Sequence, residues 1–281
     1  MKLVALSMVK NEEYWIWYSL TSVHPFVDEI LLFDNGSTDE TLAIVRSMPH
    51  IADKLTVFEG FGGSSEQENR ERMLQVARRR AATHVLFVDG DEVHGEAPLG
   101  FCSTLLQLHE HTPPLQDPPA NHMRPLDCIP TDGILIKNIG MRPICPGFAG
   151  PDTCRPHDHV QPDTDHGCYN YAIRIAALHN LRGNGKEWGL HGYVETGDLY
   201  IQASPQTLWL PKAWYFHFSH HPRSSQRGLG GEAYGRAPTD YGSVPIHEHV
   251  STPKVLFRSD GPSNPTLEMW RLRSRPVAVS C

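Results

Sequence analysis

Three acidic side chains, Asp89, Asp91 and Glu92, directly follow the apolar segment 85–88. The β-branched and aromatic residues of that segment predict a strand buried on both faces, as in a parallel sheet. Crowded carboxylates repel one another unless a cation neutralises them. Hard oxygen donors at this density suit Mg²⁺ or Mn²⁺, whose remaining ligands are often waters and substrate phosphates. The motif therefore predicts a metal–diphosphate site; the alternative is an acidic turn after a buried strand.

Another carboxylate, Asp34, ends a second apolar segment, 30–33. The dipeptide at 35–36 favours a turn, and any of the polar residues 37–39 can cap a helix that begins near Glu40. Open α/β sheets bind ligands beyond the carboxyl ends of their strands. Asp34 would then lie at a ligand-binding edge. The alternative is a strand, turn and helix without a ligand.

Alternating strands and helices are expected to position these acids. We expect a first helix with Asn11 as its N-cap, acids in its first turn and its end near His24. A long helix is expected over 66–82, where Glu, Arg, Gln, Leu and Ala predominate. The predicted strands are 3–9, 30–33, 55–58, 85–88, 133–137 and 171–176.

The composition restricts the class of protein. The chain has 281 residues, of which 40% are hydrophobic, which suits one large α/β domain. The formal net charge of −7 argues against a general nucleic-acid surface. No apolar run approaches the ~20 residues that span a bilayer, and residues 1–10 predict a strand rather than a signal peptide. Six cysteines without regular spacing agree with a reducing compartment, so we expect a cytoplasmic protein.

Four segments together carry a family resemblance: SMVKNEE, FDNGSTDET, QENR and THVLFVDGDEV. Their order and approximate spacing resemble those of family-2 glycosyltransferases of the GT-A fold, the inverting Asp-x-Asp type, over about the first 95 residues. The resemblance implies an α/β fold with a mixed, mostly parallel sheet flanked by helices. It also implies a single GT-A domain over 1–281, with a nucleotide-binding half at 1–95 and an acceptor-binding half with loop insertions at 96–281.

The same resemblance implies a role for each matching residue. Asp34 would bind the base or ribose of a nucleotide sugar, with Glu12 beside it. Arg70 would contact the base or the diphosphate. Asp89 and Asp91 would bind the metal, with Asp89 also among the nucleotide-sugar contacts. The expected cofactor is Mn²⁺ or Mg²⁺.

Later residues would complete the site. By position, Glu195 best matches the general base that deprotonates an acceptor hydroxyl, with His191 and Asp198 as rivals. His217, near the end of an apolar run, matches the position at which similar enzymes have a histidine ligand of the metal. His220 and His221 are rivals for this role. The alternatives are a surface acid for Glu195 and a core histidine for His217.

Two further segments carry weaker expectations. The Cys- and His-rich segment 145–168 has ligand types that suit Zn²⁺, but its spacing is not that of a standard zinc module, and incidental residues are the alternative. The segment 223–241 predicts a mobile loop, in which Arg223 or Arg227 would neutralise a leaving diphosphate.

The sequence thus predicts a metal-dependent inverting glycosyltransferase of hexosyltransferase type. It would move a sugar from a nucleoside-diphosphate sugar to a hydroxyl of a glycan, lipid or small molecule. Uridine and guanosine donors remain equally open. One alternative is a haloacid-dehalogenase-like phosphohydrolase, in which Asp89 would be the nucleophile. Another is a nucleotide-binding module without catalytic activity.

Overall fold

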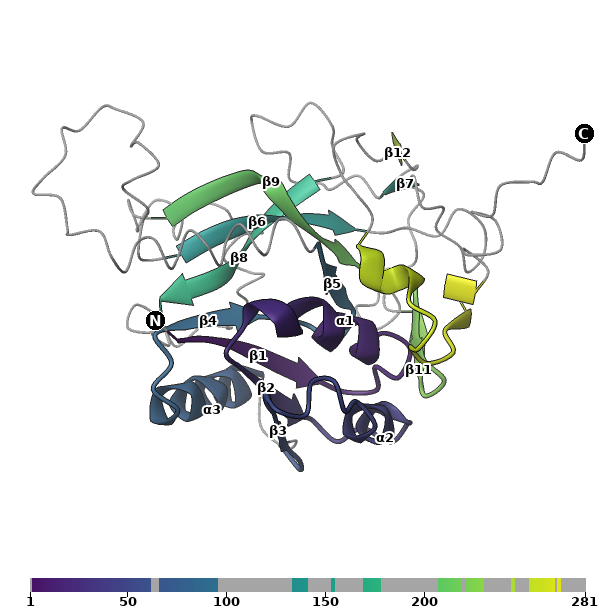
Figure 1. The fold of residues 1–281 in the computed structure, drawn as a ribbon, viewed down its shortest axis with the longest axis horizontal. Coiled ribbons are helices and arrows are strands. Elements are labelled where there is room, and N and C mark those ends of the chain that lie inside the picture. The colour runs from purple at the N-terminus through teal and green to yellow at the C-terminus, as the bar shows by residue number, and fades with distance from the viewer. Residues whose placement is uncertain are drawn as a thin grey trace, which may run out of the picture.

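The computed structural model describes residues 2–61, 66–95, 133–140, 153–154, 169–177, 207–218, 221–229, 244–245, 253–265 and 267–268. Eight strands form the main sheet in the order β3-β2-β1-β4-β8-β6-β9-β5 (Figure 1). Their bounds are β1 Leu3–Val9, β2 Glu29–Asp34, β3 Leu55–Phe58, β4 His84–Phe87, β5 Glu92–His94, β6 Gly133–Gly140, β8 Tyr169–Ala177 and β9 Thr207–His217. Within these ranges, no helix is both long and apolar enough to cross a membrane.

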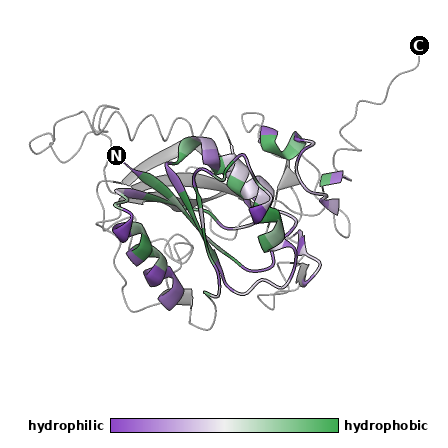
Figure 2. Ribbon diagram, turned by 60° about the horizontal axis from the view of Figure 1, so that its bottom comes forward, coloured by the Kyte–Doolittle hydropathy of each residue, from purple (hydrophilic) through white to green (hydrophobic). Residues whose placement is uncertain are grey.

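The first four strands form a parallel half-sheet, in which β1 lies between β2 and β4. The helices that connect them are α1 Ile16–Val23, α2 Thr41–Arg46 and α3 Glu66–Arg79. Right-handed crossovers place α1 and α2 on one face, because both lead toward the β3 edge, and place α3 on the other face. Figure 2 shows α3 across the sheet from α1. The direction of winding therefore reverses between β1 and β4, where such sheets bind ligands.

The remaining strands extend the sheet from β4. β8 pairs antiparallel with β4 and β6, β6 pairs parallel with β9, and β5 pairs antiparallel with β9. The expected α/β class, with a mixed and mostly parallel sheet flanked by helices, is confirmed. The short strand β5 was not expected from the sequence. Its register places Glu92 opposite His217, and so brings the acidic turn to the end of β9.

The core lies on both faces of the parallel strands. The side chains of Leu6, Leu31 and Phe33 are at most 1% exposed, and burial of one such side chain stabilises a fold by about 1.5–3 kcal/mol. On α1, Trp15, at the N-cap, and Tyr18 are fully buried. A strand whose side chains are buried on both faces must be apolar throughout, which explains the continuous hydrophobic runs.

Two helix boundaries differ from expectation. The helix expected to follow an N-cap at Asn11 begins at Ile16, with Trp15 as its N-cap. Asn11 adopts a left-handed conformation, with φ of 56°, rather than the extended one of a capping residue. Its side-chain oxygen instead accepts a hydrogen bond of 2.7 Å from the backbone N of Thr38. α3 ends at Arg79 because Ala81 is left-handed, and the N of Ala82 donates to the carbonyl of Ala77, which closes the helix.

Six smaller elements complete the described structure. β10 Pro222–Ser224 and β11 Arg227–Leu229 form a hairpin, β7 Thr153–Cys154 pairs with β12 Val244–Pro245, and η1 His24–Phe26 and η4 Lys254–Phe257 are single 3₁₀ turns. The hairpin overlaps the start of the segment 223–241, which was predicted to be a loop. That prediction is wrong for residues 223–224 and 227–229, which are paired strands.

Candidate active site

Asp34 ends β2 and lies at the carboxyl edge of the parallel strands, as expected. Its side chain is 3% exposed, and its carboxylate accepts hydrogen bonds from the backbone N of Gly36 and Ser37 at 3.1 Å. Gly36 adopts φ of 82°, which permits this tight turn. The N of Asn35 also donates to the carbonyl of Val9 at 2.8 Å. These bonds hold the loops after β1 and β2 together.

The acidic motif after β4 forms a compact turn. The N of Glu92 donates to the carbonyl of Asp89, and the N of Asp89 donates to the Glu92 carboxylate, both at 3.1 Å. The hydroxyl of Ser19, on α1, donates to the same carbonyl of Asp89 at 2.9 Å. Gly90 contacts the loop after β1, since a Cβ there would lie 2.6 Å from Cγ of Glu12. The turn is therefore fixed against the first strand.

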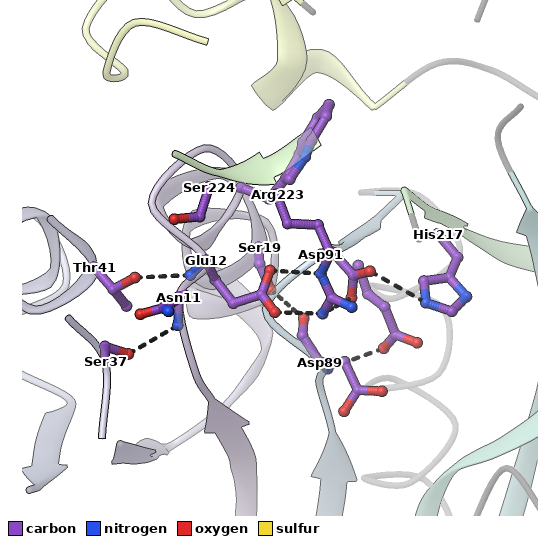
Figure 3. Close-up of polar contacts among 12 residues, drawn as sticks. Asn11, Glu12, Ser19, Ser37, Thr41, Asp89, Asp91, His217, Arg223 and Ser224 are labelled. Atoms are coloured by element: carbon purple, nitrogen blue, oxygen red, sulfur yellow. Dashed lines mark hydrogen bonds and ion pairs between the residues drawn. The ribbon is translucent and has the colours of Figure 1, made fainter. Parts of the chain in front are cut away.

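Asp91, like Glu92 in the same turn, is fully buried, with 0% exposure. Figure 3 shows it between Arg223 and His217: Oδ1 lies 3.1 Å from Nη2 of Arg223, and Oδ2 lies 3.4 Å from Nε2 of His217. Burial alone would raise the pKa of Asp91, but the positive charges of Arg223 and His217 hold it far below its ordinary range. The carboxylate is therefore ionised, and it in turn raises the pKa of His217 against the effect of burial.

His217 is the more open side of this cluster. Its side chain retains 20% exposure, whereas that of Asp91 has none. A ligand that reaches Asp91 would therefore approach past the imidazole. His221, one of the rivals for this position, is instead buried with its ring edge-on to Trp15 and Phe218. His220 lies outside the described residues.

Arg223 and Glu12 form a buried ion pair that the sequence did not reveal. Nε and Nη2 of the guanidinium both donate to the carboxylate of Glu12, the former at 2.9 Å. The side chains are 9% and 2% exposed. Burial would lower the pKa of Arg223, but Asp91 and Glu12 together raise it above its ordinary value. Arg223 is thus a fixed positive charge within the acidic cluster, and this partner of Glu12 is 211 residues away in sequence.

The segment around Arg223 is fastened to the start of α1. Trp15 stacks on Phe218 with ring centroids 3.8 Å apart, and its indole N donates to the carbonyl of Pro222 at 2.8 Å. The N of Tyr14 donates to the carbonyl of Arg223 at 3.1 Å. The N of Phe218 donates to the carbonyl of Asp91 at 2.9 Å. The backbone that carries His217 and Arg223 is therefore held at the turn after β4.

Two neighbours near the start of α3 are buried. Arg70, expected at the nucleotide, is 6% exposed, and Asn69 is fully buried. Both amide atoms of Asn69, and the hydroxyl of Ser7 on β1, lack a hydrogen-bond partner among the described residues. Unpaired buried polar atoms are uncommon and call for an explanation, such as a ligand. Asn69 was not among the predicted site residues; its position next to Arg70 in the QENR segment was the available signal.

The donor types at Asp91 and His217 suit a divalent cation, and Nε2 of His217 lies 3.4 Å from Oδ2 of Asp91. In the described ranges no group of three or more His, Cys, Asp or Glu side chains is arranged to hold an ion. Two protein ligands are nevertheless sufficient where waters and substrate phosphates complete the shell. The residues present therefore fit a cation that binds together with a diphosphate.

Several predicted residues lie outside the described structure. They are Glu195, His191, Asp198 and, apart from Cys154 on β7, the cysteines and histidines of 145–168. The backbone of Arg227 belongs to β11, at the tip of the hairpin. The zinc site and the identity of the general base therefore remain predictions.

The chain matches no protein-family profile and no curated protein. It is similar in structure to S. aureus TarS 1-349 in complex with UDP-GlcNAc, at 19% identity and a TM-score of 0.49, over 86% of this chain and 63% of that one. It is also similar to the mannosyltransferase PcManGT from Pyrobaculum calidifontis in complex with GDP-Man and Mn²⁺ (16%, TM-score 0.43, 81% of this chain and 58% of that one). A third similar structure is a putative nucleotide-diphospho-sugar transferase from Desulfovibrio desulfuricans G20. It has 11% identity and a TM-score of 0.40, over 80% of this chain and 84% of that one.

The chain spans 61% of the length of TarS 1-349 in a second structure of that protein. It spans 36% of a longer TarS chain. At these identities and TM-scores, the likeness does not establish a function for this chain.

Proposed function

We propose that this protein is a metal-dependent GT-A-type glycosyltransferase, which moves a hexose with inversion from a nucleoside-diphosphate sugar to an acceptor hydroxyl. The observation that carries the proposal is the pairing of Asp91 with His217 after β4, near the reversal of winding between β1 and β4. Asp34, at the end of β2, lies at the same edge of the sheet. Acids at the carboxyl ends of parallel strands and an imidazole at the open side suit a cation and a diphosphate together.

In this proposal different residues of the chain bind the nucleoside, the cation and the nucleotide sugar. Asp34 and Arg70 bind the nucleoside, with Asn69 beside them. Asp91 and His217 hold the cation, and Asp89 contacts the nucleotide sugar. A bound Mn²⁺ or Mg²⁺ would neutralise charge that develops on the leaving diphosphate. Residues 1–95 form the nucleotide half of one domain over 1–281, and the later residues form the acceptor half.

The acceptor side of the proposal rests on the sequence. An attacking hydroxyl must lose its proton to a base, and Glu195 is the proposed base. The acceptor is a glycan, a lipid or a small molecule that presents this hydroxyl.

A phosphohydrolase has less support. That chemistry needs Asp89 as a nucleophile, usually after the first strand of its sheet, whereas here the motif follows β4. A silent nucleotide-binding module would use the same acids, and only a test of transfer separates it from the enzyme.

The test is a thermal-shift series with UDP and GDP, each with and without Mn²⁺. We expect one nucleotide to stabilise the protein, and more so with Mn²⁺. Asp91→Asn should abolish the increment due to Mn²⁺. Asp53→Asn, a matched change at an exposed acid, should leave it intact, since that side chain is 69% exposed. If neither nucleotide stabilises the wild type, or if Asp91→Asn retains the full Mn²⁺ increment, the proposal is wrong.

A further inference from the structure

Arg223, expected to neutralise a leaving diphosphate, instead contacts two acids of the predicted site. Its guanidinium is bound along one edge by Glu12, and the shared Nη2 atom reaches Oδ1 of Asp91 at 3.1 Å. The side chain is 9% exposed, which leaves little room for a leaving diphosphate to reach it. A function within the protein therefore suits this arginine better than direct contact with a substrate.

The two carboxylate oxygens of Asp91 have different partners. Oδ1 is held by Arg223, and Oδ2 faces Nε2 of His217 on the more exposed side (Figure 3). An ion pair at one oxygen restrains the rotation of a carboxylate about its Cβ–Cγ bond. The remaining oxygen then points in one direction, which is what a ligand with strict geometry requires.

Glu12 gives Arg223 its balance of charge. A guanidinium paired with Asp91 alone would cancel the charge of that carboxylate and compete with a cation. Here the fork of Nε and Nη2 lies on Glu12 and Asp91 receives one contact, so Arg223 shares its charge between two carboxylates. Asp91 thus keeps its net negative charge while its orientation is fixed.

The backbone around Arg223 is anchored independently of these charges. The carbonyl of Arg223 accepts from the N of Tyr14, the hydroxyl of Ser224 donates to Asp39, and the N of Ser225 donates to Glu13 at 2.5 Å.

We infer that Arg223, matched by Glu12, is the positioning residue for Asp91 and turns Oδ2 toward His217 for a divalent cation. The inference rests on the proposed function, because that function requires the cation.

Calorimetric titration of Mn²⁺, alone and with UDP or GDP present, tests this role. Arg223→Lys cannot make the fork to Glu12 and reach Asp91 together, and should raise the Kd for Mn²⁺ by about 10–100-fold, as outer-shell substitutions do. Glu12→Gln should also raise it, since the whole charge of Arg223 then falls on Asp91. The matched controls are Arg46→Lys and Glu59→Gln, which alter an ion pair whose side chains are 57% and 52% exposed; their Kd should equal that of the wild type.

Each outcome decides the role of Arg223. Unchanged or tighter Mn²⁺ binding in folded Arg223→Lys and Glu12→Gln would overturn it. If one variant does not fold, the other decides, and if neither folds, the pair serves the fold alone and the inference is wrong. A wild type that binds UDP or GDP but no Mn²⁺ would overturn the inference and leave nucleotide binding standing. A wild type that binds no nucleotide would instead defeat the proposed function.

Discussion

Two regions build the candidate site, and they differ in how the sequence encodes them. The strand ends within 2–95 place Asp34 and Asp91 by local pattern, since each acid follows an apolar run. The segment 215–226 supplies His217 and Arg223 from far along the chain, and its contacts reach back 211 residues. The comparison shows that negative charge comes with the strands, whereas the charges that balance it arrive only through tertiary packing.

The largest expected effect comes from removing the balancing charge. Arg223→Ala leaves two buried carboxylates without their shared partner, and should lower the free energy of unfolding by about 3–5 kcal/mol. Arg46→Ala breaks an exposed pair with Glu59 and should cost less than about 1 kcal/mol. Urea denaturation of both variants measures the difference.

Similar losses in these two variants would break the comparison. They would show that the distant segment adds no more to stability than a surface ion pair does.

A smaller effect is expected within the N-terminal region itself. In Gly90→Ala, the new Cβ would lie 2.6 Å from Cγ of Glu12 and 3.1 Å from Cγ1 of Val9. Glu12 cannot move aside easily, because Arg223 holds its carboxylate. We expect a loss of about 1–3 kcal/mol in the free energy of unfolding, typical of overpacking, from chemical denaturation. A change below about 0.5 kcal/mol would show that the turn after β4 is free to shift.

The smallest effect concerns pH. Burial alone would raise the pKa of Glu13, but hydrogen bonds from Ser225 and Glu40 lower it below its ordinary 4.5. A carboxylate with a lowered pKa stabilises the fold above its unfolded pKa, and this contribution is lost as pH falls through the folded pKa. Wild type should therefore exceed Glu13→Gln in stability by about 1 kcal/mol at pH 7, with a smaller gap below pH 4.5.

Unfolding curves of both proteins across this pH range provide the measurement. A gap that stays constant with pH would mean that Glu13 does not fasten the distant segment through its charge.

Much of the parallel half was predictable from sequence. The strand over 3–9 is observed with those bounds, and those over 30–33 and 55–58 agree within one residue, because buried parallel strands require continuous apolar runs. The start of α1 was not predictable, since Asn11 bonds to Thr38 across the loops instead of capping its own helix. The pairing of Glu12 with Arg223 was hidden for a related reason: charge complementarity between distant residues leaves no periodic signal.

The ion pair between Glu12 and Arg223 has a consequence for synthesis on the ribosome. The strands of the first 95 residues emerge early, while the arginine that accompanies Glu12 and Asp91 is translated much later. Until then, closing these strands would trap two like charges away from water. In the nascent N-terminal half, the carboxyl ends of the parallel strands are therefore expected to stay loosely packed. They are expected to pack fully only after the hairpin of β10 and β11 has been synthesised.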